Sequence, residues 1–281
     1  MIKYILIHML GRPLAYRLGR ALYMEARNDV SNDIPINGEL LVQQSVVEAW
    51  ISKFPEDNLV VFDCGANVGN WSLPLLLYCR SKGRDSINLH AFEPVPSTAQ
   101  LLKNKLLEFS SITFSDIALS SESGEIAMNI VGEGAGTNSL HSENPLQERQ
   151  VLVQRLTASD YCQLNNIKII HLFKCDTEGH DMEVIKGALP LLEEGRIMVL
   201  QFEYNHRWIY SRHFLKDVFD VISETGYRLG KICPKHIELY DKWYPELDRF
   251  FEANYCIIKD EAINGFKTVE CRLDKHNAIL P

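Results

Sequence analysis

Short apolar runs and one-sided apolar stripes alternate along most of the chain. Continuous runs rich in β-branched, leucine and aromatic residues occupy positions 59–62, 87–92, 112–114, 169–173 and 197–202. Runs of this length predict strands that are buried on both faces of a sheet. Apolar residues also recur at helical spacing, at Met182, Ile185 and Leu189 and at Phe214, Val218 and Ile222. The pattern therefore predicts an α/β fold with a doubly wound, mostly parallel sheet, whose ligands lie beyond the carboxyl ends of the strands.

Three segments depart from this alternation. Positions 124–155 predict a strand pair around the polar loop 132–150, and the part 132–142 either closes over a ligand or forms an exposed turn. A later strand pair, at 227–232 and 254–259, is expected at the edge of the sheet. Residues 1–55 look helical and predict an arm or cap, so we divide the chain into this arm and a ligand-binding domain at 56–281.

Composition and charge narrow the class of protein. The 281 residues are 46% hydrophobic and 23% charged, which is ordinary for a soluble globular protein, and the net charge is −8. That charge disfavours a nucleic-acid partner, because phosphate contacts need clustered Lys and Arg. No apolar run approaches the roughly 20 residues of a membrane span. We expect a cytoplasmic protein without stable membrane insertion. The apolar N-terminus is followed by Arg12, Arg17 and Arg20, so two alternatives stay open: a helix that lies on a membrane surface, or a helix that packs on the domain.

The seven cysteines predict no disulfide framework. They are odd in number, widely separated and without a CxxC pair, so their spacing matches neither paired disulfides nor a structural zinc site. We expect them to be small buried residues in a reducing compartment.

The loop after the first strand carries candidate ligand-binding chemistry. It reads VVFDCGANVGNWS and places Asp63 at the strand end, with Gly65 and Gly69 where the backbone turns and approaches a ligand. Asn70 is the expected N-cap of the helix that follows. The spacing is neither GxGxxG nor a P-loop, which disfavours a dinucleotide and a triphosphate. A carboxylate repels a pyrophosphate but attracts an ammonium or sulfonium group.

Two further acids follow at the ends of the next two strands. Glu93 is positioned to accept the ribose hydroxyls of an adenosine, and Asp116 to accept a hydrogen bond from an adenine amino group. Three acids at successive strand ends predict an adenosine without phosphates and with a cationic tail. S-adenosylmethionine fits that description.

At these positions the chain resembles the FkbM family of methyltransferases, within the S-adenosylmethionine-dependent class I fold. The matching segments span about 60–205 and are VVFDCGANVGNWS, AFEPVP, SDIALSSESGEI, LTASDY, IIHLFKCDTEGHDMEVIKGA and IMVLQFEYN. The most specific is K-x-D-x-E-G-H, from Lys174 to His180. Cys175 and Thr177 depart from the Ile and Val of many members.

The resemblance implies methyl transfer to a hydroxyl of a sugar, glycoside or natural product. It also implies a Rossmann-like sheet of seven strands, the seventh antiparallel. Residues that would hold the methionine end of the cofactor are Asp63, Gly65, Ala66, Asn67, Gly69 and Asn70. Glu93 would hold the ribose, and Asp116 with Ala118 would frame the adenine.

The fourth and fifth strands deliver the candidate catalytic groups. A hydroxyl acceptor must lose a proton, and Asp176 and His206 are the candidate bases, in that order, ahead of His180. The alternative role of Asp176 is to contact the methionine amino group. Glu203 is expected to bind substrate hydroxyls or to orient Lys174. His206 and Trp208 are expected at the acceptor site, with a core position as the alternative for Trp208.

Several alternatives stay open. Asp176, Glu178, Glu203 and His206 offer ligands that Mg²⁺ or Ca²⁺ accepts, although we do not expect a metal. The acceptor atom is nitrogen in a second hypothesis, which the sequence DTEGH in place of an Asn-Pro-Pro-Tyr type of loop disfavours. A cofactor-binding protein without activity and a nicotinamide-dependent dehydrogenase are more distant hypotheses. The expected partner is a small-molecule acceptor, and a homodimer is left open.

Overall fold

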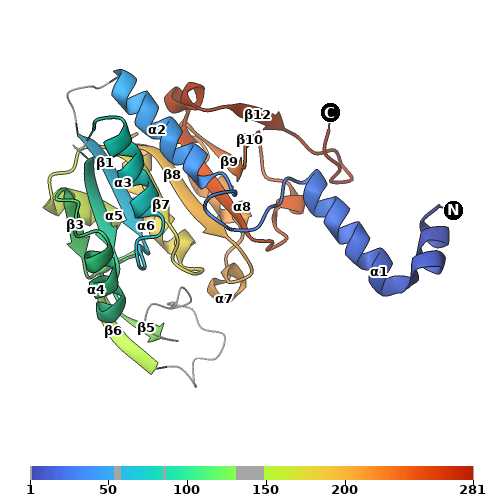
Figure 1. Ribbon diagram of the computed structural model, residues 1–281, viewed down its shortest axis with the longest axis horizontal. Coiled ribbons are helices and arrows are strands. Elements are labelled where there is room, and N and C mark those ends of the chain that lie inside the picture. Colours follow the sequence, from blue (N-terminus) through green and yellow to red (C-terminus); the bar gives the residue numbers. More distant parts are fainter. Residues whose placement is uncertain (1, 54–57, 85–86, 131–148, 281) are drawn as a thin grey trace.

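The computed structural model describes residues 2–53, 58–84, 87–130 and 149–280. Within them, nine strands form one sheet in the order β12-β10-β9-β11-β8-β7-β1-β2-β3 (Figure 1). The strands of this sheet are β1 (Leu59–Cys64), β2 (Ile87–Phe92), β3 (Ile112–Ser115), β7 (Ile170–Cys175), β8 (Ile197–Tyr204), β9 (Tyr227–Cys233), β10 (His236–Tyr240), β11 (Ala253–Lys259) and β12 (Thr268–Cys271). The α/β fold with a mostly parallel sheet is confirmed.

The centre of the sheet is parallel and its far side is mixed. Strands β3, β2, β1, β7 and β8 pair in parallel, and β11 runs antiparallel between β8 and β9. The predicted pairing of β9 with β11 is confirmed, but its predicted position at the sheet edge is wrong. Strand β10 pairs antiparallel with β9 and β12 pairs with β10, so two strands extend the sheet beyond the seven that the resemblance implied.

A second, small sheet lies beside the carboxyl ends of the parallel strands. It contains β4 (Ala118–Leu119), β5 (Gly124–Ile130) and β6 (Arg149–Leu156), in the order β4-β6-β5. Strands β5 and β6 are antiparallel, as predicted for positions 124–155. The loop 132–142 between them lies outside the described residues.

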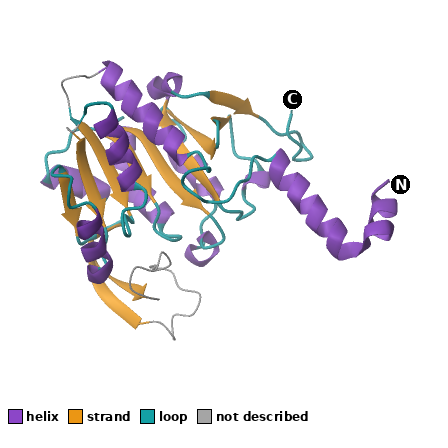
Figure 2. Ribbon diagram, viewed as in Figure 1, coloured by secondary structure: helices purple, strands orange, loops and turns teal. Residues whose placement is uncertain are grey.

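Helices cover both faces of the large sheet (Figure 2). One core layer contains buried side chains of α5 (Ala158–Leu164), α6 (Asp181–Glu193) and α8 (Leu215–Ile222), and the other those of α2 (Glu39–Lys53), α3 (Ser72–Ser81) and α4 (Pro96–Lys105). The short elements α7 (Trp208–Ser211), η1 (Pro245–Leu247) and η2 (Asp260–Gly265) complete the described chain. All seven cysteines are buried and none of them forms a disulfide, as expected.

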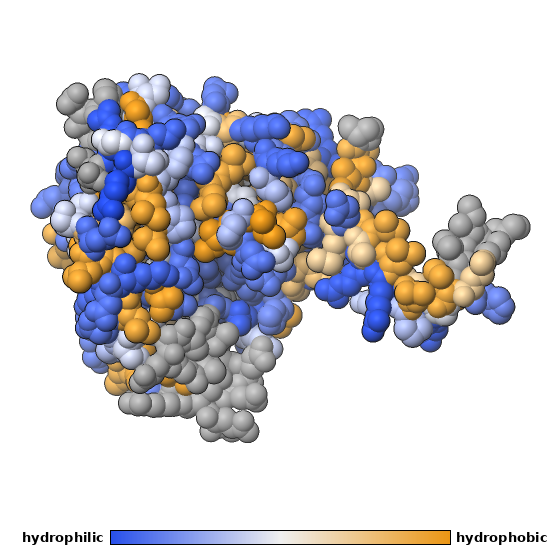
Figure 3. Space-filling model, viewed as in Figure 1, coloured by the Kyte–Doolittle hydropathy of each residue, from blue (hydrophilic) through white to orange (hydrophobic). Residues whose placement is uncertain are grey.

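The two N-terminal helices behave differently. Helix α2 packs on the sheet and buries Val42, Val47 and Trp50, whereas α1 (Ile2–Ala26) projects from the body (Figure 1). Apolar side chains such as Met9 and Leu22 lie exposed along α1 (Figure 3). No helix among the described residues is long and apolar enough to cross a membrane. The division of the chain at residue 55 stays a prediction.

Close packing between α6 and the segment after β4 generates the first prediction. Gly187 lies inside α6, where a Cβ atom would come within 2.0 Å of the carbonyl oxygen of Ser120. We expect Gly187→Ala to lower the free energy of unfolding by about 1–3 kcal/mol, since the added methyl forces backbone to move. Urea unfolding measures this as a lower midpoint with an unchanged slope.

Gly19→Ala is the matched control. Gly19 also lies inside a helix, but no atom lies within 4 Å of its added Cβ. Alanine favours a helix over glycine by about 1 kcal/mol, so this variant should not be destabilised. Equal midpoints for the two variants would contradict the packing argument.

Candidate active site

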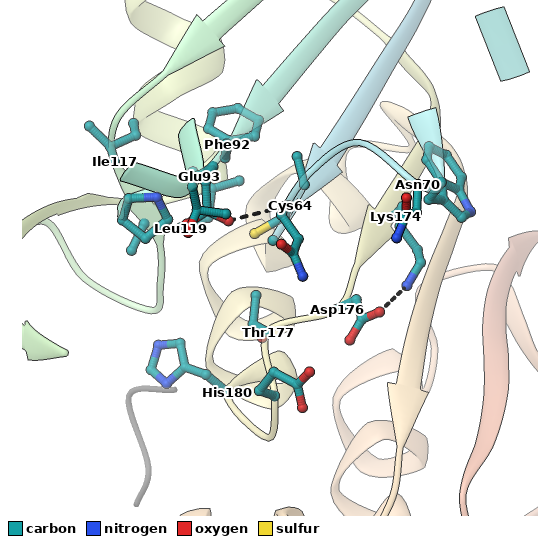
Figure 4. Close-up of a pocket in the computed structure, with 18 of the residues that line it drawn as sticks. Cys64, Asn70, Phe92, Glu93, Ile117, Leu119, Lys174, Asp176, Thr177 and His180 are labelled. Carbon is teal, nitrogen blue, oxygen red and sulfur yellow. Dashed lines mark hydrogen bonds and ion pairs between the residues drawn. The ribbon is translucent and has the colours of Figure 1, made fainter. Parts of the chain in front are cut away.

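A pocket opens at the carboxyl ends of β1, β2 and β7, where the sheet topology predicts a ligand site. Its walls come from the loop after β1, the end of β2, the segment 117–119 and the segment after β7 (Figure 4). Residues of the N-terminal segment, Asn32, Ile34 and Glu39, also line it. The site therefore combines the predicted strand ends with a part of the chain that carries little family signal.

The loop after β1 lies in direct contact with the end of β7. Gly65 has a φ of 78°, and a Cβ atom there would lie 1.9 Å from the carbonyl oxygen of Asp176. The backbone N–H of Asp176 donates to the carbonyl of Cys64 at 3.0 Å, and that of Gly65 to the carbonyl of Phe92 at 3.1 Å. Only glycine fits this position. The loop is thereby fixed between β2 and β7.

Polar atoms of this loop are left available at the pocket. Among the described residues, Asn67 Oδ1 and Trp71 Nε1 are buried without a hydrogen-bond partner, and both residues line the pocket. A buried polar atom costs free energy unless a partner satisfies it. The loop is therefore suited to a polar ligand.

Two loop residues differ from their predicted roles. Gly69 is not among the pocket-lining residues, and a Cβ atom there would lie 2.9 Å from the Leu102 side chain of α4. Asn70 lines the pocket and accepts a hydrogen bond from Lys105 at 2.5 Å. The prediction that Asn70 caps the helix is wrong, because α3 begins at Ser72 and Trp71 precedes it.

Glu93 lies in the pocket wall at the end of β2, as predicted. Its Oε2 accepts the backbone N–H of Asn67 at 3.0 Å, and its Oε1 accepts that of Val95 at 3.0 Å. Burial raises the pKa of this carboxyl to about 7, against the lowering effect of both hydrogen bonds. Glu93 thus links the β1 loop to the β2 end and still faces the pocket.

Asp63 and Asp116 do not line the described pocket. The Asp63 carboxylate is buried and accepts a hydrogen bond from Ser72 Oγ, and burial raises its pKa to about 6. Asp116 is exposed and pairs with Lys103 at 3.3 Å, while Ile117 next to it lines the pocket. The chain leaves β3 at Ser115 and the Asp116 side chain is exposed, so the expected contact of Asp116 with an adenine stays a prediction that this pocket does not support.

A buried cation lies beside the predicted acids. Lys174 is 2% exposed, and its Nζ lies 2.9 Å from Asp176 Oδ2 and 3.8 Å from Glu39 Oε2. Burial alone lowers the pKa of the ammonium, but Asp176 and Glu39 outweigh that effect and raise it. Lys174 is therefore charged. Figure 4 shows its ammonium directed at Asp176.

Glu39 is a site residue that the sequence analysis missed. It is the first residue of α2, is 3% exposed, and lines the pocket. Its Oε1 accepts from Asn37 at 2.7 Å and its Oε2 from Gln201 at 2.5 Å. The sequence signal was the turn residues Asn37-Gly38 before a helix, which indicate where the helix starts but not what its first residue contacts.

Glu203 lies behind the pocket and reaches it through Asn32. It accepts hydrogen bonds from Asn32 Nδ2 and, at 2.8 Å, from Asn205 Nδ2. Burial first, and then the carboxylates of Asp176 and Glu178, raise its pKa well above the ordinary value. Asn32 lines the pocket, whereas Glu203 does not.

The remaining candidate site residues lie in different surroundings. Glu178 lines the pocket and pairs with Arg207, and burial is the first cause of its raised pKa. His180 lines the pocket with Nε2 at 3.0 Å from Ser120 Oγ. His206 is exposed and is not among the pocket-lining residues. Trp208 is fully buried and donates its indole N–H to the Glu203 carbonyl, which is the core position that the sequence left open as its alternative.

The residues suggested as ligands of a divalent cation do not lie close enough together to share one ion. Within the described ranges, no three of Asp176, Glu178, Glu203 and His206 bring ligand atoms within 4.8 Å of one another. We therefore propose no metal at this pocket.

A family profile described as "Methyltransferase FkbM domain" matches residues 63–229, more than half of the chain. The chain belongs to the FkbM methyltransferase family. It is therefore an S-adenosylmethionine-dependent methyltransferase, and this family membership implies use of that cofactor.

Two curated proteins and a solved structure illustrate the similarity. The hexuronic acid methyltransferase AglP of Haloferax volcanii is 25% identical over 189 residues, which cover 66% of this chain and 70% of AglP. Methyltransferase 1 of Beauveria bassiana is 28% identical over 159 residues, 49% of this chain and 61% of its own length. The precorrin-6y C5,15-methyltransferase of Geobacter metallireducens matches at 12% identity over 78% of this chain and 86% of its own, with a TM-score of 0.40.

The pocket of this FkbM-family protein fits the cofactor that its family implies. Gly65 leaves room for close approach, Asn67 Oδ1 and Trp71 Nε1 offer an acceptor and a donor, and Glu93 presents a carboxylate. Acids and amides dominate the polar wall, which suits a positively charged ligand.

Glu93 also makes stability depend on pH. Its folded pKa of about 7 lies above its ordinary value of 4.5, so the folded chain holds a proton that the unfolded chain releases. The free energy of unfolding should therefore fall as pH rises from about 4.5 to about 7, by on the order of 2–3 kcal/mol from this group. Asp63 acts in the same direction at lower pH.

Glu93→Gln should flatten that pH dependence. Urea unfolding of the cofactor-free protein across this range measures the difference between variant and wild type. Glu252→Gln, at an exposed position, is the matched control and should leave the slope unchanged. Parallel profiles for wild type and Glu93→Gln would contradict the assignment.

Proposed function

We propose that this FkbM-family enzyme transfers the methyl group of S-adenosylmethionine to a hydroxyl oxygen of a sugar or another small hydroxylated molecule. The observation that carries the proposal is the wall of Asn32, Glu39, Asp176 and Glu178 beside the cofactor loop. Carboxylates accept hydrogen bonds from hydroxyl groups, and side-chain amides both accept hydrogen bonds from them and donate to them. The name of AglP, a hexuronic acid methyltransferase, supports a sugar as acceptor.

The proposed cofactor contacts use residues that line the pocket. Gly65, Ala66, Asn67 and Asn70 hold the methionine end, and Glu93 holds the ribose. Ala118 frames the adenine together with its neighbours Ile117 and Leu119. Asp63 and Gly69 support the loop from behind, through Ser72 and Leu102 respectively. Asp116 has no cofactor contact in this proposal.

Asp176 is the proposed base. When bound, the cofactor supplies an electrophilic methyl group on a sulfonium, and the acceptor oxygen must lose its proton as it attacks. The Asp176 carboxylate lies at the pocket with its side chain 35% exposed, so it is accessible to an acceptor. Lys174 fixes the carboxylate at 2.9 Å, and Glu203 fixes Asn32, which lines the same pocket. Both are positioning residues, and His206 is too exposed to share the role of base.

Asp176→Asn separates the two roles that the sequence allowed. If Asp176 is the base, turnover should fall by about 10²–10⁴-fold, while the affinity for S-adenosylhomocysteine changes little. Single-turnover kinetics and calorimetry measure the two quantities. Asp220→Asn, on the exposed face of α8, is the control and should keep wild-type turnover. A weakened affinity with unchanged turnover would instead place Asp176 on the methionine amino group.

The acceptor proposal predicts the chemistry of the product. We expect methylation of neutral glycosides to give ethers that survive mild alkali. The acid-rich wall accepts hydrogen bonds from hydroxyl groups, whereas it repels an acceptor carboxylate. Incubation with labelled cofactor, a neutral glycoside and the matching uronide, followed by mass spectrometry, tests this.

Three outcomes would contradict the proposal. An alkali-labile ester on the uronide would place the methyl group on a carboxylate. Labelled methyl on an amine acceptor would place it on nitrogen. Failure to bind S-adenosylhomocysteine would contradict methyl transfer from this cofactor as such.

A further inference from the structure

The β9–β10 hairpin places three different metal-ligating side chains on one face. Only Pro234 and Lys235 separate the two strands, and Cys233 pairs with His236 across the turn. Glu238 follows His236 by two residues along β10. Cross-strand partners and residues two apart share a face of a sheet, so the three side chains point the same way.

The ligand atoms of these three residues converge. Cys233 Sγ, a ring nitrogen of His236 and a carboxylate oxygen of Glu238 all lie within 4.8 Å of one another, and His236 Nε2 lies 3.8 Å from Glu238 Oε1. Ligands of one tetrahedral zinc ion lie roughly 3.3–3.7 Å apart, given metal–ligand bonds of about 2.0–2.3 Å. Cys233 is fully buried and Glu238 is 7% exposed, so this is not a solvated surface cluster.

Neighbouring groups hold the carboxylate in place. Asn28 Nδ2 donates to Glu238 Oε1 at 2.7 Å, and the Tyr240 hydroxyl donates to Oε2 at 3.0 Å. Hydrogen bonds of this kind orient metal ligands in known sites.

The charge around the cluster also permits a cation. Lys231 lies opposite Glu238 in the hairpin, but its ammonium is already bound by Asp29 and by the carbonyl of Arg27. Cysteine binds zinc as a thiolate, so zinc has to displace the thiol proton of Cys233 and binds more weakly as pH falls.

We propose that Cys233, His236 and Glu238 bind a zinc ion. Thiolate, imidazole and carboxylate together are typical zinc ligands, whereas Mg²⁺ and Ca²⁺ take oxygen ligands alone. Three protein ligands leave the fourth tetrahedral position to water. The site lies on the mixed side of the sheet and takes no part in the proposed methyl transfer.

The site has a structural role. It joins the hairpin to the segment 27–39, because Asn28 binds Glu238 and Gly38 packs against the carbonyl of Cys233, where a Cβ atom would lie 2.3 Å away. The same segment brings Asn32 and Glu39 to the pocket. Zinc therefore stabilises the backbone on which one wall of the active site depends.

Metal analysis of the full chain tests the proposal. After dialysis against EDTA and then against buffered Zn²⁺, the wild type should retain about one zinc per chain on gel filtration, measured by mass spectrometry of the metal. Cys233→Ala and His236→Ala should bind zinc at least tenfold more weakly. Cys162→Ala removes another buried thiol, in α5, and should bind as the wild type does.

Co²⁺ substitution provides a second measurement that does not depend on activity. A thiolate-to-cobalt absorption band should form in the wild type and in Cys162→Ala but not in Cys233→Ala. Zinc retained by both hairpin variants, or none retained by the wild type, would overturn the proposal. Should the hairpin variants fail to fold, the wild type decides alone, since it must bind Co²⁺ through a thiolate and unfold at a higher temperature with Zn²⁺ than with EDTA.

Discussion

The buried ammonium of Lys174 is the constraint on which the candidate site depends. A charge removed from water costs several kcal/mol unless a partner of opposite charge and hydrogen bonds replace the lost hydration. Asp176 follows in the same segment, but Glu39 comes from the start of α2, far earlier in the chain. Docking of the N-terminal segment on the sheet thus supplies part of the neutralisation that Lys174 needs.

That pairing leaves more carboxyl groups than cations around the pocket. One buried lysine faces the carboxyls of Glu39, Asp176 and Glu203, and burial raises the pKa of Glu203 and Glu93. A bound cation favours the ionised carboxylates that burial disfavours. A sulfonium cofactor therefore suits this pocket electrostatically, beyond the hydrogen bonds that the loop of β1 offers.

The sequence predicted the parts of the site that depend on local pattern. Strands β1, β2, β7 and β8 were found because a strand buried on both faces is a continuous apolar run, and their carboxyl ends carried Glu93 and Asp176 to the pocket. Asp116 follows a strand as Glu93 does but does not line the pocket, because position after a strand does not determine on which side a side chain emerges. Glu39 was missed because its contacts come from distant segments, which no short window contains.

The N-terminal segment is held from two sides, and this explains why the pocket extends beyond the family's motifs. On the hairpin side, Asn28 binds Glu238 and Asp29 binds Lys231. On the pocket side, Asn32 binds Glu203 and Glu39 lies near the ammonium of Lys174. Cysteine spacing alone gave no hint of the hairpin cluster, because its ligands are of three residue types joined by a two-residue turn. A metal there and a salt bridge at the pocket act on the same short backbone, so loss of either loosens the wall that contains Asn32. The wall that contains Asn32 and Glu39 is therefore set by contacts between distant segments, and the wall formed by the loop after β1 by local sequence.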